Sequence, residues 1–220
     1  MEESLVVDST VATSSPLQGI EVLFLGGWVI WPLIVLSIVA LWIFFERFLL
    51  LRAVERDHKG LNEALSAPIR SHDVDDIKRL CTTKDIPLSR LLRSGLDRLG
   101  HPIEEIRAAL ESTGRQEAFV IEKRTEYLAT IAGIAPMLGF LGTVTGMITT
   151  FQEIQSLQGN VNPAVLAGGI WEALITTAAG LSIGVAALLM YNLLMSRIDR
   201  IVHNMERSAS QVVDVLSTPA

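Results

Sequence analysis

The chain has 220 residues, of which 50% are hydrophobic and only 19% charged, and its mean hydropathy of +0.41 is too high for an ordinary soluble domain. A formal charge of -6 argues against a nucleic-acid partner, and a single cysteine excludes an intramolecular disulfide and a CxxC site. The four histidines show no metal-ligand spacing, so Cys81 and the histidines are interpreted as structural and no metal is expected.

The first apolar stretch, residues 22–45, is uncharged throughout and long enough to cross the hydrocarbon core as a helix. Tryptophans lie near its ends, where indole rings favour the membrane interface: Trp28, Trp31 and Trp42. The acidic segment 1–21 that precedes it has no basic region and no small-residue cleavage site. We therefore expect a retained membrane anchor and not a signal peptide.

The region 46–126 is mixed in charge, and its apolar residues recur at helical spacing, which predicts a packed helical region. Pro102 followed by Glu104 and Glu105 is typical of a helix start, because acidic side chains in the first turn meet the positive end of the helix dipole. No further proline follows until residue 136. The pattern predicts one continuous helix over 102–135 that enters the second membrane span.

Two further stretches, 127–151 and 165–194, are also long and apolar enough to span a membrane, with a short turn at 152–164 between them. Apolar residues continue at helical spacing beyond the third span, so residues 195–220 are expected to extend its helix. The expected fold is an all-α integral membrane protein with three transmembrane helices. Its second and third helices extend into the cytoplasm, and a helical loop region lies between the first two spans.

The distribution of positive charge predicts the orientation of the chain. Fifteen of the 18 Lys and Arg residues lie in 47–124 and the other three follow the third span, whereas 1–46 and 152–164 contain none. Because cytoplasmic segments are enriched in Lys and Arg, we expect the N-terminus and the 152–164 turn to be periplasmic. The large loop and the C-terminus are then cytoplasmic.

Small residues form a stripe on each of the last two predicted spans. GxxxG patterns occur at Gly142 and Gly146 and again at Gly180 and Gly184, and Gly139 extends the first of them. Small side chains let two membrane helices approach closely. The stripes therefore predict close packing between these spans or between neighbouring subunits.

Glu172 is the single acidic or basic side chain in the third span, and the predicted spans contain no Lys, Arg or His. A carboxylate at that depth costs about 2.5 to 3.5 kcal/mol on insertion scales. It is either kept neutral by a helix neighbour or faces a pore or partner helix and exchanges protons. A metal site would require further carboxylates. Hydroxyl groups that could relay protons are plentiful on the two spans: Thr143, Thr145, Thr149, Thr150, Thr176 and Thr177.

The two later spans resemble the ExbB/TolQ/MotA proton-channel family, and the ExbB and TolQ branch in particular. The resemblance lies in LATIAGIAPMLGFLGTVTGMITTF at 128–151 and GGIWEALITTAAGLSIGVAALLMYNLL at 168–194. It implies that Glu172 carries the proton and that Thr143 and Thr177 line its pathway. On an ideal helix Thr177 lies about 140° from Glu172, so it must point elsewhere, for example toward a neighbouring subunit.

The resemblance also implies a homopentamer in the inner membrane of a Gram-negative bacterium, surrounded by lipid. Its pore would hold ExbD-like or TolR-like single-span subunits, and a TonB-like or TolA-like protein would transmit the work. No enzymatic activity and no cofactor are implied. Three alternatives remain open: a TolQ-type role in envelope maintenance, a gliding or flagellar stator, and a passive membrane scaffold. A substrate transporter is disfavoured, because three spans with one carboxylate are too sparse.

Overall fold

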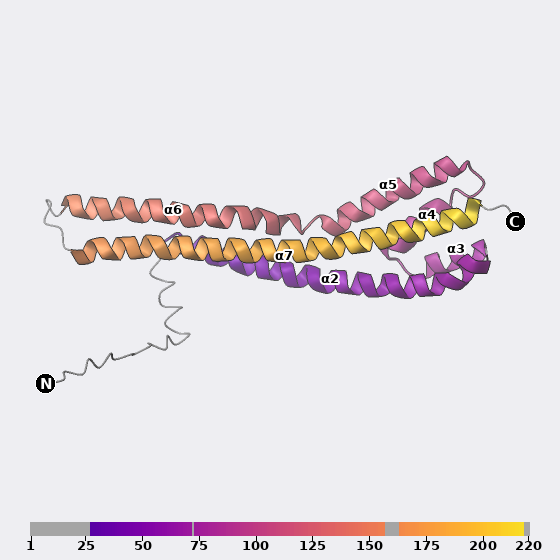
Figure 1. Ribbon diagram of the computed structural model, residues 1–220, viewed down its shortest axis with the longest axis horizontal. Helices are drawn as coiled ribbons and strands as arrows, with labels where there is room; N and C mark the ends of the chain where they lie inside the picture. The colour runs from indigo at the N-terminus through magenta and orange to yellow at the C-terminus, as the bar shows by residue number, and fades with distance from the viewer. Residues whose placement is uncertain (1–26, 72, 157–162, 218–220) are drawn as a thin grey trace, which may run out of the picture. The chain divides into compact units, whose positions relative to one another are not determined.

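The computed structural model describes residues 27–71, 73–156 and 163–217, which form helices and no strand (Figure 1). The all-α fold class predicted from the sequence is confirmed. The predicted segment 1–21 and the middle of the 152–164 turn lie outside the described residues. The helices follow one another in this order: α2 (Ile30–Ser71), α3 (Val74–Thr83), α4 (Pro87–Leu96), α5 (Ile103–Glu122), α6 (Glu126–Ser156) and α7 (Pro163–Ser217).

Three of these helices, α2, α6 and α7, are long and apolar enough to cross a membrane. Many of their large apolar side chains are exposed, among them Ile38 on α2, Met137 and Phe140 on α6, and Leu189 on α7. Such exposure is unfavourable in water, whereas lipid or neighbouring membrane helices would cover it. The three predicted apolar helices are thus present, and their orientation remains a prediction.

The first spanning helix differs from the expectation at both ends. Residues 27–29, which were predicted to belong to the span, form a turn before α2, and α2 begins at Ile30. It then continues without interruption to Ser71, a length of 42 residues. Beyond the apolar stretch its buried side chains include Leu51, Leu61 and Leu65, which recur at helical spacing. The packing of these leucines explains why α2 continues far beyond its apolar stretch. The sequence had predicted such an extension only for the second and third spanning helices.

The prediction of one continuous helix over 102–135 is wrong, because a turn at residues 123–125 separates α5 from α6. There the Thr125 N–H donates to the Glu122 carbonyl oxygen at 2.7 Å, a tighter step than a regular α-helix makes. The turn buries Thr125 fully and lets Arg124 pair with Glu46 of α2 at 2.6 Å. No proline or glycine marks it, so contacts distant in sequence produce the break.

The third spanning helix continues as predicted. α7 runs for 55 residues to Ser217, and the buried side chains on its C-terminal part include Ile198, Ile201 and Met205. The predicted helix start near Pro102 is also confirmed to within one residue, because Pro102 is the N-cap of α5 and Glu104 and Glu105 occupy the first turn.

The chain divides into two compact units, each with its own packing. Unit 1 comprises Met1–Val35 and Ile134–Gly184, and its described core contains Ile30, Leu33 and Ala135. Unit 2 comprises Leu36–Gly133 and Val185–Ala220. In unit 2, α4 packs against both α3 and α5 and buries an apolar face that includes several leucines: Leu88, Leu91, Leu92 and Leu96.

Candidate functional site

Glu172 lies on α7 in unit 1, within a helix that qualifies as a membrane span, and is half-buried. Its carboxylate lies against the backbone of Gly27, in the turn that precedes α2. A Cβ atom at position 27 would collide with Oε1 of Glu172 and would lie 3.3 Å from Cδ. Gly27 also has a φ of +63°, which side-chain-bearing residues rarely adopt. Glycine is therefore required here both for space and for conformation.

Within the described residues the Glu172 carboxylate forms no hydrogen bond and no ion pair. Because an unpaired carboxylate is expensive in a membrane, the group is suited to meet a proton or a partner side chain at this position. No group of three or more His, Cys, Asp or Glu side chains among the described residues is arranged to hold a metal ion.

The two threonines assigned to the pathway donate to backbone carbonyl oxygens. Thr177 donates to Gly139 of α6 at 3.0 Å, so its hydroxyl joins two helices of one chain and does not point toward a neighbouring subunit. Thr143 donates to Phe140 at 2.6 Å on its own helix, and Thr176 donates to Ala173 at 2.8 Å. The structure does not join these hydroxyls to the carboxylate in one hydrogen-bonded chain.

The predicted small-residue stripes include positions where α6 and α7 are in close contact. A Cβ atom at Gly180 would lie 2.6 Å from the Ala135 carbonyl oxygen and 2.8 Å from the Gly139 Cα. A Cβ atom at Gly142 would collide with the side chain of Thr176. Because the first two contacts are with backbone atoms, no rotation of a side chain can relieve them. The helices can therefore be this close only with glycine at these positions.

The close approach continues along both helices. A Cβ atom at Gly146 would lie 3.3 Å from the Ala173 Cβ, a tight contact, and Gly184 is buried. Sequence reasoning did not single out Gly169, where a Cβ atom would collide with Oγ1 of the buried Thr150. The residue that Gly169 faces lies on another helix, so no spacing pattern in the sequence points to this contact. That is why sequence reasoning missed it.

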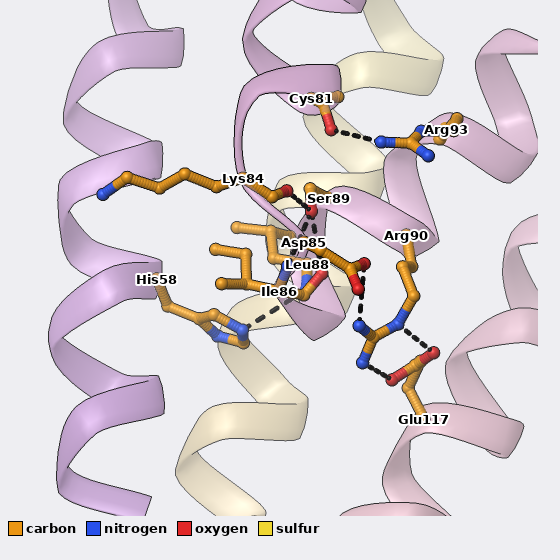
Figure 2. Close-up of polar contacts among 10 residues, drawn as sticks. All are labelled: His58, Cys81, Lys84, Asp85, Ile86, Leu88, Ser89, Arg90, Arg93 and Glu117. Atoms are coloured by element: carbon orange, nitrogen blue, oxygen red, sulfur yellow. Dashed lines mark hydrogen bonds and ion pairs between the residues drawn. The ribbon is translucent and has the colours of Figure 1, made fainter.

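A second polar cluster lies in unit 2 and joins α4 to α5 (Figure 2). The Arg90 guanidinium forms a two-pronged contact with the Glu117 carboxylate, with both nitrogen-to-oxygen distances at 2.7 Å. It also donates to Asp85 at 2.9 Å. These hydrogen bonds, above all those to Glu117, raise the pKa of Arg90 above its ordinary value. The cluster fixes α4 on α5 and shows no feature of a catalytic site.

His58 of α2 caps the start of α4, because its Nε2 accepts a hydrogen bond from the Leu88 N–H at 3.3 Å (Figure 2). Burial lowers the pKa of His58 to about 4, which keeps the ring neutral and able to accept at pH 7. Burial also raises the pKa of Cys81 to about 11, so its thiol stays protonated and unreactive. For these two residues the burial and contacts agree with the structural interpretation made from the sequence.

Residues 83–207, which include both later spans, match the MotA/TolQ/ExbB proton channel family. A relative in Synechocystis sp., named putative biopolymer transport protein ExbB-like 1, is 36% identical over 78% of this chain and 68% of its own. The biopolymer transport protein ExbB of Salmonella typhimurium is 40% identical over 40% of this chain and 35% of its own. The Tol-Pal system protein TolQ of Haemophilus influenzae is 32% identical over 50% and 46%, respectively.

Proposed function

The chain belongs to the MotA/TolQ/ExbB proton channel family, and we propose that it is the proton-channel subunit of an inner-membrane motor. In this proposal it works with an ExbD-like partner and uses the proton motive force to energise TonB-dependent transport at the outer membrane. The observation that carries the proposal is the Glu172 carboxylate, unpaired among the described residues and positioned on a spanning helix. A passive scaffold gives no reason for such a costly group.

Glu172 would take up and release the proton, and the structure supports this role through the turn at Gly27. The glycine lets the carboxylate lie against a backbone instead of an apolar side chain, where a partner group could approach it. Each proton that crosses 100 mV supplies about 2.3 kcal/mol, enough to shift a packed interface between two arrangements. Thr143 and Thr177 are proposed to line the path, and both would exchange their present backbone acceptors for water or a partner group.

The proposed assembly is a homopentamer whose second and third spans surround ExbD-like single-span subunits. The close backbone contact between Gly139 and Gly180 supports it, because a rigid pair of helices can serve as one wall of a pore. A TonB-like protein would receive the work. We place the protein in the inner membrane with its N-terminus in the periplasm and its C-terminus in the cytoplasm, as the distribution of positive charge predicts.

A TolQ-type role is the second candidate, because the TolQ of Haemophilus influenzae matches half of this chain. The two roles share the proton site and differ in the protein that receives the work. Expression of this chain with its own single-span partner in a host that lacks both ExbB and TolQ would separate them. Restored TonB-dependent uptake supports the first role, whereas restored resistance to detergent without uptake supports the second.

Reconstitution tests the proton-channel function itself. We expect the chain and its ExbD-like partner, placed together in proteoliposomes with a membrane potential, to pass protons into a lumen that contains a pH-sensitive dye. Empty vesicles and vesicles with the partner alone are the controls. A complex that is correctly inserted and oligomeric yet passes no more protons than the controls would support the passive scaffold and refute the proposal.

A further inference from the structure

A groove of about 580 Å³ in unit 2 has no occupant among the described residues. It lies between α5 and the C-terminal part of α7. Small or apolar residues line it on both walls, Gly114 and Ala118 on α5 and Val202, Met205 and Ala209 on α7, together with charged side chains of both signs such as Arg107, Glu111 and Glu206. Small residues on both walls leave room for a bulky apolar side chain from outside. The groove therefore fits a partner that presents such a side chain.

The same helix presents a matching surface on another flank. Phe119 and Val120 on α5 are 58% and 54% exposed; we call them the Phe119–Val120 ridge. With 100° of rotation per residue around the helix axis, Phe119 lies about 110° and Val120 about 150° from the middle of the α5 face that lines the groove. The ridge thus points away from the groove of its own chain. The two surfaces can meet only if they belong to different copies.

We propose that the Phe119–Val120 ridge of one copy enters the α5–α7 groove of the next copy, so that this contact closes the ring in the cytoplasm. The proposal rests on the homo-oligomer of the proposed function. Contacts between two different surfaces of identical chains generate rings or filaments. Because membrane insertion gives every copy the same orientation, the ring axis is the membrane normal and the contact repeats until the ring closes.

Ring symmetry also fixes the height of the contact, because equivalent copies lie at one level in the membrane. Both Ala118 and Val202 line the groove, and Ala118 directly precedes Phe119 on α5. The ridge of one copy would therefore meet the end of the neighbouring groove that is formed by Ala118 and Val202. That end lies nearest to the membrane spans in both helices.

Charge complementarity at the same level supports this placement. Lys123 is the C-cap that directly follows α5, one turn beyond Phe119, and its helical backbone conformation continues the flank that carries the ridge. Asp199 lies about 60° from Val202 on α7, one turn closer to the spans. Both side chains are exposed, and neither forms an ion pair with another described residue. In the proposed ring, Lys123 of one copy would face Asp199 of the next.

Cysteine cross-linking tests the contact in the full chain, with Cys81→Ala as the background. We expect Phe119→Cys combined with Val202→Cys to give a ladder of disulfide-linked oligomers after mild oxidation. The matched control pairs Phe119→Cys with Arg200→Cys, which is exposed and close to the same level but about 160° around α7 from Val202. The control should give less than a tenth of the ladder. Equal ladders, or none for the test pair, would overturn the proposal.

A charge reversal gives an independent readout that does not depend on cysteine chemistry. Lys123→Glu should reduce the oligomeric fraction in detergent at least threefold, and Asp199→Lys in the same chain should restore it. A wild-type chain that is monomeric alone and with its partner would refute the proposed homo-oligomer as well. A native-size oligomer that forms no Phe119 to Val202 cross-link would refute this contact alone. Strong quenching of a fluorophore at position 119 by brominated lipid would also overturn it, because lipid would then cover the ridge.

Discussion

Replacement of Gly180 by alanine tests whether the close approach of α6 and α7 stabilises unit 1. The new Cβ atom would lie 2.6 Å from the Ala135 carbonyl oxygen and 2.8 Å from the Gly139 Cα, both backbone atoms of α6. The helices would have to separate by roughly 0.8 Å to reach an ordinary contact of 3.4 Å. That shift would also lengthen the 3.0 Å hydrogen bond from Thr177 to Gly139.

The magnitude of the effect is clearest against a matched variant, Gly133→Ala on α6, where the new Cβ atom has nothing within 4 Å. Alanine gains up to about 1 kcal/mol of helix propensity over glycine at both positions, so this term cancels between the two variants. Overpacking costs about 1 to 3 kcal/mol and applies only at position 180. Gly180→Ala should therefore be less stable than Gly133→Ala by about 2 kcal/mol.

Thermal unfolding of the two purified variants in the same detergent measures this difference. For a chain of this length 1 kcal/mol corresponds to about 2 to 4 °C, so the midpoint of Gly180→Ala should lie about 4 to 8 °C below that of Gly133→Ala. Equal midpoints, with both variants fully folded, would show that the helices do not rely on glycine at position 180. The reasoning from backbone contact would then be refuted.

Three further predictions concern the turn at α2 and the helices of unit 2. Gly27→Ala should abolish proton-coupled activity, because its Cβ would displace the Glu172 carboxylate. The control is Gly100→Ala, at a position that also has a positive φ but no neighbour within 4 Å. This control should lose only about 1 to 2 kcal/mol of stability. His58 has a pKa of about 4 in the folded chain, against an ordinary value of 6.5. Its contribution to the free energy of unfolding is therefore complete above pH 6.5 and is lost as the pH falls toward 4. Between pH 7 and pH 5 the free energy of unfolding should fall by about 2 kcal/mol from this source. The thermal unfolding midpoint of His58→Gln should fall less over that range than the midpoint of the unchanged chain. Glu117→Gln leaves Arg90 with a weaker acceptor and should lower the free energy of unfolding by about 2 kcal/mol. Denaturant unfolding measures this loss. The control is Glu111→Gln, which removes only an exposed ion pair.

The three long apolar helices and the position of Glu172 within one of them were predictable because they depend on local sequence. An uninterrupted run of about 20 apolar residues predicts a membrane helix wherever it occurs. Glu172 stands out for the same reason, as a single carboxylate within such a run. The long extension of α7 was also predictable, since its buried residues keep helical spacing beyond the span.

Features that depend on contacts distant in sequence were missed. The turn at 123–125 has no proline or glycine, and the pairing of Arg124 with Glu46 becomes visible only once α2 and the turn are placed together. Gly27 contacts a side chain that is far from it along the chain, so no spacing pattern reveals its role. The acceptor of Thr177 was missed for a similar reason, because an ideal helix gives a direction but not the helix that lies there.

The central claim is that Glu172 carries protons and does not hold the fold together. Glu172→Gln keeps the size of the side chain and cannot titrate, so one preparation of this variant with the proposed ExbD-like partner can report both roles. Oligomeric state by native mass and proton flux in proteoliposomes should be measured on that preparation. The account predicts an oligomer of native size whose proton flux has fallen to the level of vesicles without the complex. A fully assembled variant that still passes protons at the native rate would contradict it.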